Sequence, residues 1–181
     1  MTGIPPTPEL EQAAARLLLH DGLSGLTFGR LSRATGVSDR MLVYRFGTKA
    51  ALLERTLDLV AAGLRDQLAT LLDPSSPARM LEQAAHALTA PEHGPVLAVW
   101  FEVLAGAARK DPACTAAARN VAAGWHGWLV QVLADEPNPS FAASDLLARI
   151  EGVLVLHAAG LEEEATAVAG ARRRSALSRG S

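Results

Sequence analysis

The sequence predicts an all-α protein, and three observations support this. The chain is rich in alanine, its aromatic content is only 4%, and β-branched runs are scarce, so local propensity favours helix almost everywhere. Apolar residues recur at helical spacing between breaks made of glycine and proline. Apolar residues make up 49% and charged residues 20% of the 181 positions, which is typical of a folded chain with one full core.

About nine helices are expected. The first occupies about residues 8–20, where leucines and alanines share one face before Asp21-Gly22 ends the pattern. Thr27 and Ser38 can cap a second and a third short helix. Gly36 ends the second helix, and Gly47 is expected to be left-handed (αL) and to end the third. The later helices are expected at about 48–72, 78–88, 95–110, 112–134, 142–160 and 162–176.

The charge of the chain is unevenly distributed. The formal net charge is −2, yet the segment from Thr27 to Arg55 holds six basic residues against two acidic ones. Arg30, Arg40 and Lys49 each fall in the first turn of an expected helix, where the helix dipole makes a cation unfavourable by up to about 1 kcal/mol. A phosphate bound at the same helix end would make these cations favourable. The segment is therefore predicted to bind a polyanion.

The spacing of the second and third helices indicates a helix-turn-helix. Each is about eight residues long, and "TGV" at 35–37 joins them with a glycine that permits a tight crossing. In this arrangement the third helix enters the major groove of DNA by its N-terminal end. The residues expected to reach base edges are Ser38, Asp39, Arg40, Met41 and Val43.

The segment from about Leu10 to Leu53 resembles the DNA-binding domain of the TetR family of transcriptional regulators. The resemblance lies in "GLTFGRLSRATGVSDRMLVYRFGTKAALL". It implies a DNA-binding domain at 1–55 and a helical effector-binding and dimerisation domain at 56–181. Gly29, Arg45 and the apolar Met41-Leu42-Val43 depart from the family pattern, so base preference does not follow by analogy. The further DNA contacts expected are Thr27, Arg30, Tyr44, Arg45 and Lys49, although Tyr44 could instead pack and Lys49 could be an ordinary surface lysine.

The large aromatic residues of the C-terminal region concentrate at 100–128. They could form plain core or line an apolar cavity for an uncharged or weakly charged lipophilic effector. The residues predicted to line this effector pocket are Trp100, Phe101, Asn120, Trp125 and His126.

A homodimer is expected from the helix at 142–160. An apolar stripe lies next to small residues that would let another helix approach closely. The predicted interface residues are Leu147, Ile150, Gly152, Leu154 and His157. The resemblance also suggests a four-helix contact across a two-fold axis.

The function expected is that of a DNA-binding repressor. The resemblance implies a homodimer on a pseudo-palindromic operator of double-stranded DNA, released by a small-molecule effector. The alternative is an architectural, sequence-tolerant DNA-binding protein without an effector. No enzyme, cofactor or metal site is expected, because the five histidines and the single Cys114 form no ligand pattern and no catalytic grouping stands out. A cytoplasmic protein without membrane contact is expected, because no apolar run reaches about 18 residues.

Overall fold

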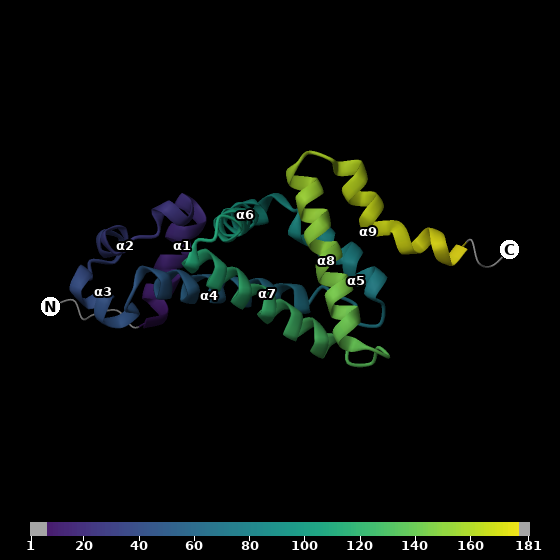
Figure 1. The fold of residues 1–181 in the computed structure, drawn as a ribbon, viewed down its shortest axis with the longest axis horizontal. Coiled ribbons are helices and arrows are strands. Elements are labelled where there is room, and N and C mark those ends of the chain that lie inside the picture. The colour runs from purple at the N-terminus through teal and green to yellow at the C-terminus, as the bar shows by residue number, and fades with distance from the viewer. Residues whose placement is uncertain (1–6, 178–181) are drawn as a thin grey trace. The chain divides into compact units, whose positions relative to one another are not determined.

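The computed structural model describes residues 7–177, with side chains described for 8–170. Over this range the chain forms nine α-helices and one 3-10 turn, without a strand (Figure 1), so the all-α prediction is confirmed. The elements are α1 (Thr7–Gly25), α2 (Phe28–Thr35), α3 (Asp39–Phe46), α4 (Lys49–Ala69), α5 (Pro77–Leu88), η1 (Pro91–His93), α6 (Gly94–Ala108), α7 (Pro112–Val132), α8 (Pro139–Ala158) and α9 (Glu162–Leu177).

Three of the later helices begin in the same way, with a capping side chain followed by proline. The side chains of Ser76, Asp111 and Asn138 accept a backbone N–H three residues ahead, at 3.4, 2.8 and 3.2 Å. The proline that follows each cap fits the first helical turn, because the N–H it lacks would have had no partner within the helix. Asn138 thus starts α8 at Pro139, three residues before the position expected from the sequence.

Glycines with positive φ interrupt the N-terminal helices. Gly22 (φ 68°, ψ −168°) breaks α1 at the position expected for its end, although helical turns continue to Gly25. Gly36 ends α2 in the left-handed conformation (φ 72°, ψ 4°). Gly47 also has positive φ, but its ψ of −96° lies outside the αL region, so the αL end predicted for α3 was wrong.

The chain divides into two compact units. The first contains residues up to Leu64 together with Pro95–Ala122, and the second contains Arg65–Gly94 and residues from Ala123 onward. The functional boundary predicted between residues 55 and 56 is a different division and stays a prediction. None of the described helices combines the length and the apolarity needed to cross a membrane.

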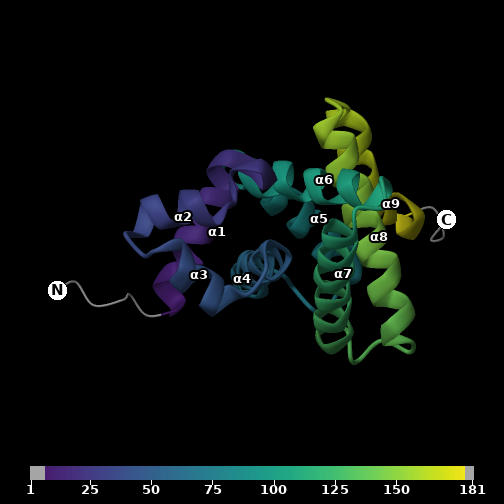
Figure 2. The ribbon, with the colours of Figure 1, turned by 60° about the vertical axis from the view of Figure 1, so that its left-hand side comes forward.

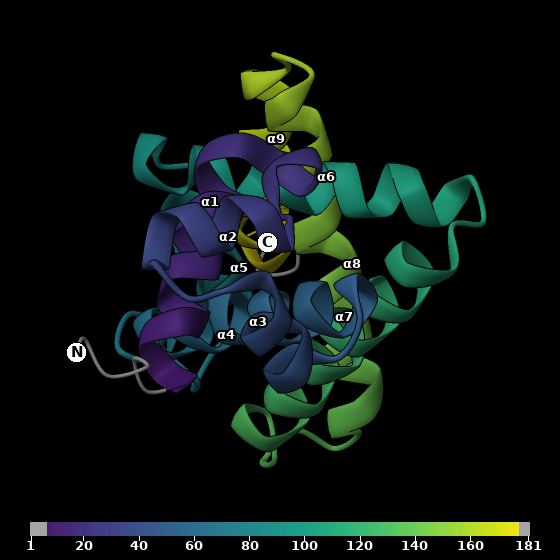
Figure 3. The same cartoon turned by 90° about the vertical axis from the view of Figure 1, so that its left-hand side faces the viewer.

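The core of the first unit joins α1, α2, α3 and α4. Figure 3 looks onto the first three of these helices. Each contributes leucines whose side chains are fully buried: Leu10 and Leu18 from α1, Leu31 from α2, Leu42 from α3 and Leu52 from α4. Burial of leucine stabilises a fold by roughly 1.5–3 kcal/mol per side chain. These contacts fix α2 and α3 on the longer helices.

In the second unit, α5, α8 and α9 pack against one another (Figure 2). Ala85, Val153 and Ala165 form a small buried cluster, one residue from each helix. Arg149 of α8 also donates a hydrogen bond of 3.0 Å to the carbonyl of Val168 in α9. Helices α8 and α9 are thereby joined by both apolar and polar contacts.

Candidate DNA-binding surface

Hydroxyl side chains cap the three helix starts at which basic residues are found. Thr27 Oγ1 accepts the N–H of Arg30 at 3.2 Å, and Ser38 Oγ accepts the N–H of Met41 at 3.4 Å. Thr48 Oγ1 accepts the N–H of Ala51 at 3.1 Å, at the start of α4. Each cap satisfies one of the backbone donors left free at a helix start, and the others remain for solvent or an anion.

Helix α3 has one buried and one exposed face. Leu42 and Phe46 are buried together with Val37 of the preceding turn, which fixes the rotation of α3 about its axis. The opposite side carries Tyr44, 84% exposed, and Val43, 46% exposed. An aromatic side chain so open to solvent contributes little to the core and is available to a partner.

The predicted base-reading and phosphate-binding residues fall on the α2–α3 side of the first unit and at the start of α4. Arg30, Ser38, Asp39, Arg40, Tyr44 and Lys49 are exposed, whereas Thr27, Met41 and Arg45 are half-buried. Among the described residues, none is a hydrogen-bond or ion-pair partner of the side chains of Arg40 or Lys49. Within the part of the chain that the structure describes, the side chains of these two cations near helix starts are thus available to an anion.

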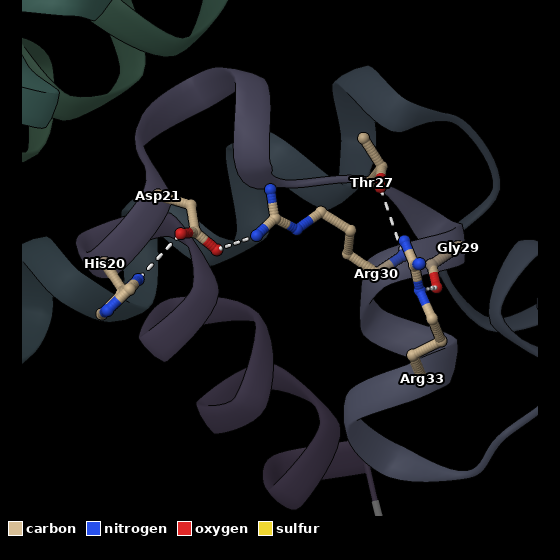
Figure 4. A network of polar contacts seen from close by, with 6 residues as sticks. All are labelled: His20, Asp21, Thr27, Gly29, Arg30 and Arg33. Atoms are coloured by element: carbon tan, nitrogen blue, oxygen red, sulfur yellow. Dashed lines mark hydrogen bonds and ion pairs between the residues drawn. The ribbon is translucent and has the colours of Figure 1, made fainter.

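Arg30 differs from Arg40 and Lys49 because it is paired within the protein (Figure 4). Its Nη2 lies 2.7 Å from Asp21 Oδ2, and the other oxygen of Asp21 lies 2.7 Å from His20 Nδ1. The hydrogen bond from His20 and the charge of Arg30 together hold the pKa of Asp21 below its ordinary value. Arg30 is therefore partly neutralised within the protein, and its predicted contact with DNA stays a prediction.

Arg55 was not singled out by the sequence, yet it ties α4 to both α1 and α3. Its Nη2 lies 2.6 Å from Glu11 Oε1 in α1, and its guanidinium carbon lies 5.4 Å from the ring centroid of Phe46, the last residue of α3. One side chain of α4 therefore contacts both α1, which precedes the helix-turn-helix, and α3, its second helix.

The residues predicted for the effector pocket are divided between the two units. Trp100 and Phe101, half-buried on α6, belong to the first unit together with Asn120, whose amide donates to Glu54 Oε1 at 3.4 Å. Trp125 and His126 belong to the second unit. There Trp125 meets Trp128 edge to face at 5.6 Å, Arg65 lies over the Trp125 ring at 5.7 Å, and His126 Nε2 lies 3.1 Å from Ser144 Oγ. Their assignment to one pocket stays a prediction.

The predicted dimer residues lie on different sides of α8. Ile150 and Leu154 are buried within the chain, so this part of the apolar stripe faces inward and not toward an open face. Leu147 and His157 are half-buried, Gly152 is exposed, and His157 Nδ1 lies 2.8 Å from Glu162 Oε1 at the start of α9. The exposed apolar side chains of α8 are instead Phe141 and Val155, 70% and 52% exposed.

The short capped helices α2 and α3, with the outer face of α3 open to solvent, define the helix-turn-helix fold of DNA-binding regulators. Residues 11–56 match the family model described as bacterial regulatory proteins, tetR family. Over these residues, the resemblance to the TetR family of transcriptional regulators that was expected from the sequence is confirmed. A comparison with curated proteins found no match.

Solved structures share the fold over nearly the whole chain. A transcriptional regulator from Rhodococcus sp. Rha1 is 22% identical with a TM-score of 0.67, over 91% of this chain and 92% of that one. A TetR transcription regulator from Haloarcula marismortui is 21% identical with a TM-score of 0.65, over 93% and 94%. The multidrug binding protein EbrR, complexed with imidazole, is 23% identical with a TM-score of 0.69, over 91% and 93%. At these identities the likeness establishes the fold.

Proposed function

We propose that this regulator is a repressor that binds a pseudo-palindromic operator as a homodimer and is released by a small lipophilic effector. The observation that carries the DNA-binding part is the exposed side of α3, where Arg40 and Lys49 lie beside capped helix starts and have no hydrogen-bond or ion-pair partner among the described residues. A phosphate backbone would supply the missing negative charge. The proposal assigns the protein no enzymatic activity.

The exposed residues divide into two proposed roles. Lys49, Tyr44, Arg30 and Thr27 bind phosphates, because they lie at helix starts or at the end of α3, where they position the protein without reading sequence. Ser38, Asp39, Arg40 and Met41 form the first turn of α3 and its cap, the part of a recognition helix that reaches base edges in the major groove. Arg45, half-buried, lies one turn further along α3.

A second copy is proposed to bind through α8. Gly152 is exposed and has no side chain, so a partner helix can approach α8 closely at this position. The exposed Phe141 and Val155 provide apolar surface for that partner helix. A two-fold axis at this contact would repeat the α3 reading helix about 34–36 Å away, one turn of DNA.

The effector is proposed to bind beside the aromatic residues of α6, Trp100 and Phe101. Small residues around large rings leave room for a lipophilic molecule more readily than for a strongly charged one. EbrR, which has the same fold, was solved with imidazole bound. For release, the effector must bind better to the conformation that does not bind DNA, with a coupling of about 1–3 kcal/mol.

Selection of binding sites from random DNA by the purified protein tests the DNA-binding proposal. We expect enrichment of one pseudo-palindromic sequence. Enrichment of none, with equal affinity for all DNA, would favour the architectural alternative.

Two substitutions then separate the proposed roles. Lys49→Ala is expected to weaken binding to all DNA and to reduce the salt-dependence slope by about one unit, because one phosphate contact is lost. Arg40→Ala is expected to change the sequence preference as well as the affinity. Arg109→Ala removes an exposed cation just after α6 and is the charge control. If Arg40→Ala weakened binding to operator and random DNA equally, Arg40 would not be a base-reading residue.

A further inference from the structure

A carboxylate of α6 is hydrogen-bonded to the turn that precedes the helix-turn-helix. Glu102 Oε2 accepts the backbone N–H of Leu23 at 2.9 Å, although the two residues are 79 positions apart in the sequence. Both belong to the first compact unit. Leu23 follows Gly22, where α1 breaks, and Thr27, the cap of α2, comes four residues later. The contact therefore links α6 to the segment that leads into α2.

The turn lies directly against the carboxylate of Glu102. Gly22 has φ 68°, and a Cβ placed there would lie 2.5 Å from Glu102 Oε1, so the carboxylate occupies the space that a side chain would need. On the other side of the turn, a Cβ at the buried Gly25 would collide with the Cβ of Asp21.

The same turn holds Arg30 in place. Asp21, only 19% exposed, lies directly before Gly22, and its carboxylate holds the guanidinium of Arg30 at 2.7 Å (Figure 4). The Arg30 side chain is 44% exposed, and a guanidinium carries five N–H donors, so the pair with Asp21 leaves donors available for a phosphate. A side chain held in its bound orientation before DNA arrives loses less conformational entropy on binding.

We propose that Glu102 is a positioning residue for DNA binding. By accepting the N–H of Leu23, its carboxylate sets the orientation of Asp21 and Arg30. The affinity for the operator therefore depends on the position of α6. The inference rests on the proposed DNA-binding function. Its consequence is a defined route by which a displacement of α6 reaches the DNA-contacting surface. The route consists of Glu102, the turn at Gly22-Leu23, Asp21 and Arg30.

The test measures operator affinity of Glu102→Ala and Glu102→Gln, using the DNA site selected by the wild-type protein. Glu102→Ala is expected to bind about three- to tenfold more weakly, the range that corresponds to one ordinary hydrogen bond. Its salt-dependence slope should fall by about 0.9, because the phosphate contact of Arg30 is lost. Glu102→Gln keeps an oxygen that can accept the Leu23 N–H and is expected to bind nearly as well as the wild type.

A matched control removes the same charge elsewhere. Glu92→Ala, on the exposed surface of η1, is expected to leave binding unchanged or to strengthen it slightly, because a negative charge that repels DNA is lost. Weaker binding by Glu102→Ala therefore cannot be an effect of net charge. If folded Glu102→Gln bound as weakly as Glu102→Ala, the accepted hydrogen bond would not be the cause and the proposal would be overturned.

The double variant Glu102→Ala/Arg30→Ala decides whether Glu102 acts through Arg30. If it does, the double variant binds as weakly as Arg30→Ala alone, because the second change has nothing left to perturb. If the two substitutions instead reduced the operator affinity by independent factors that multiply, Glu102 would only support the fold, and the proposal would be overturned. A wild type that selects no DNA site would refute the proposed function itself, whereas normal operator binding by Glu102→Ala would refute only the positioning role.

Discussion

Replacing Arg55 by alanine tests how α3 is held on the long helix α4. The Arg55 side chain makes two contacts at once, an ion pair with Glu11 at 2.6 Å and a cation–π contact with Phe46 at 5.4 Å. Both partners belong to helices of the DNA-binding region. The substitution removes both contacts and leaves the buried part of Phe46 in place.

The expected loss of stability follows from the exposure of these groups. The side chains of Arg55 and Glu11 are 46% and 21% exposed, so solvent screens the ion pair, and its contribution is about 0.2–1 kcal/mol. A cation–π contact at an exposed site contributes about 0.5–1 kcal/mol. The free energy of unfolding should therefore fall by about 1–2 kcal/mol, which lowers the urea midpoint by roughly 0.5 M.

Urea unfolding followed by circular dichroism and tryptophan fluorescence measures this change. Arg55→Lys is the matched variant, because it keeps the charge and loses the planar guanidinium that stacks on the ring, so an intermediate midpoint is expected. A double-mutant cycle with Glu11→Ala isolates the ion pair. An Arg55→Ala protein within about 0.3 kcal/mol of the wild type, with no coupling to Glu11, would refute the reasoning, because such a difference lies within the additivity error.

Three further predictions concern assembly, acid stability and the single thiol. Gly152→Arg is expected to give monomers in light scattering and weak operator binding, while Gly127→Arg, at another exposed helical glycine, stays dimeric; a wild type that is monomeric at micromolar concentration would contradict the interface on α8. Asp21 has a pKa below its ordinary value of 3.8, so its ionised form stabilises the fold above that pH, and this contribution is lost as the pH falls through the lowered pKa. The difference in unfolding free energy between wild type and Asp21→Asn should therefore shrink in acid, and a difference independent of pH would count against the pairing with His20 and Arg30. Burial raises the pKa of the Cys114 thiol. Alkylation of this thiol by iodoacetamide at about pH 8 should therefore be much slower in the folded protein than in urea. Equal rates of alkylation would mean that the thiol is open to solvent.

Much of the fold was predictable because its signals are local. The caps at Thr27, Ser38 and Asp111 act on N–H groups three residues away, so the sequence around each cap contains the cause of the helix start. The 3-10 turn at Pro91–His93 was missed because "APEHGP" reads only as a break. The burial of Ile150 and Leu154 within the chain did not follow from the sequence, because helical periodicity identifies an apolar face without saying which neighbour covers it.

The DNA-binding surface was predictable in part for the same reason. The exposed residues of α3 follow from a short motif, whereas the pairs that hold this motif in place join distant positions. Arg55 and Glu11 are 44 residues apart, and Leu23 and Glu102 are 79 apart. No spacing rule connects such residues before the chain is folded, so their contribution appears only in the structure.

The two compact units are interleaved along the chain, and this has a consequence for synthesis on the ribosome. The first unit consists of residues up to Leu64 and of Pro95–Ala122, so its last part is made only after a stretch of the second unit has emerged. Helix α3 is complete at Phe46, yet α6 begins only at Gly94 and Glu102 is translated later still. A nascent chain that ends before α6 would present the helix-turn-helix without the carboxylate that holds the Leu23 N–H.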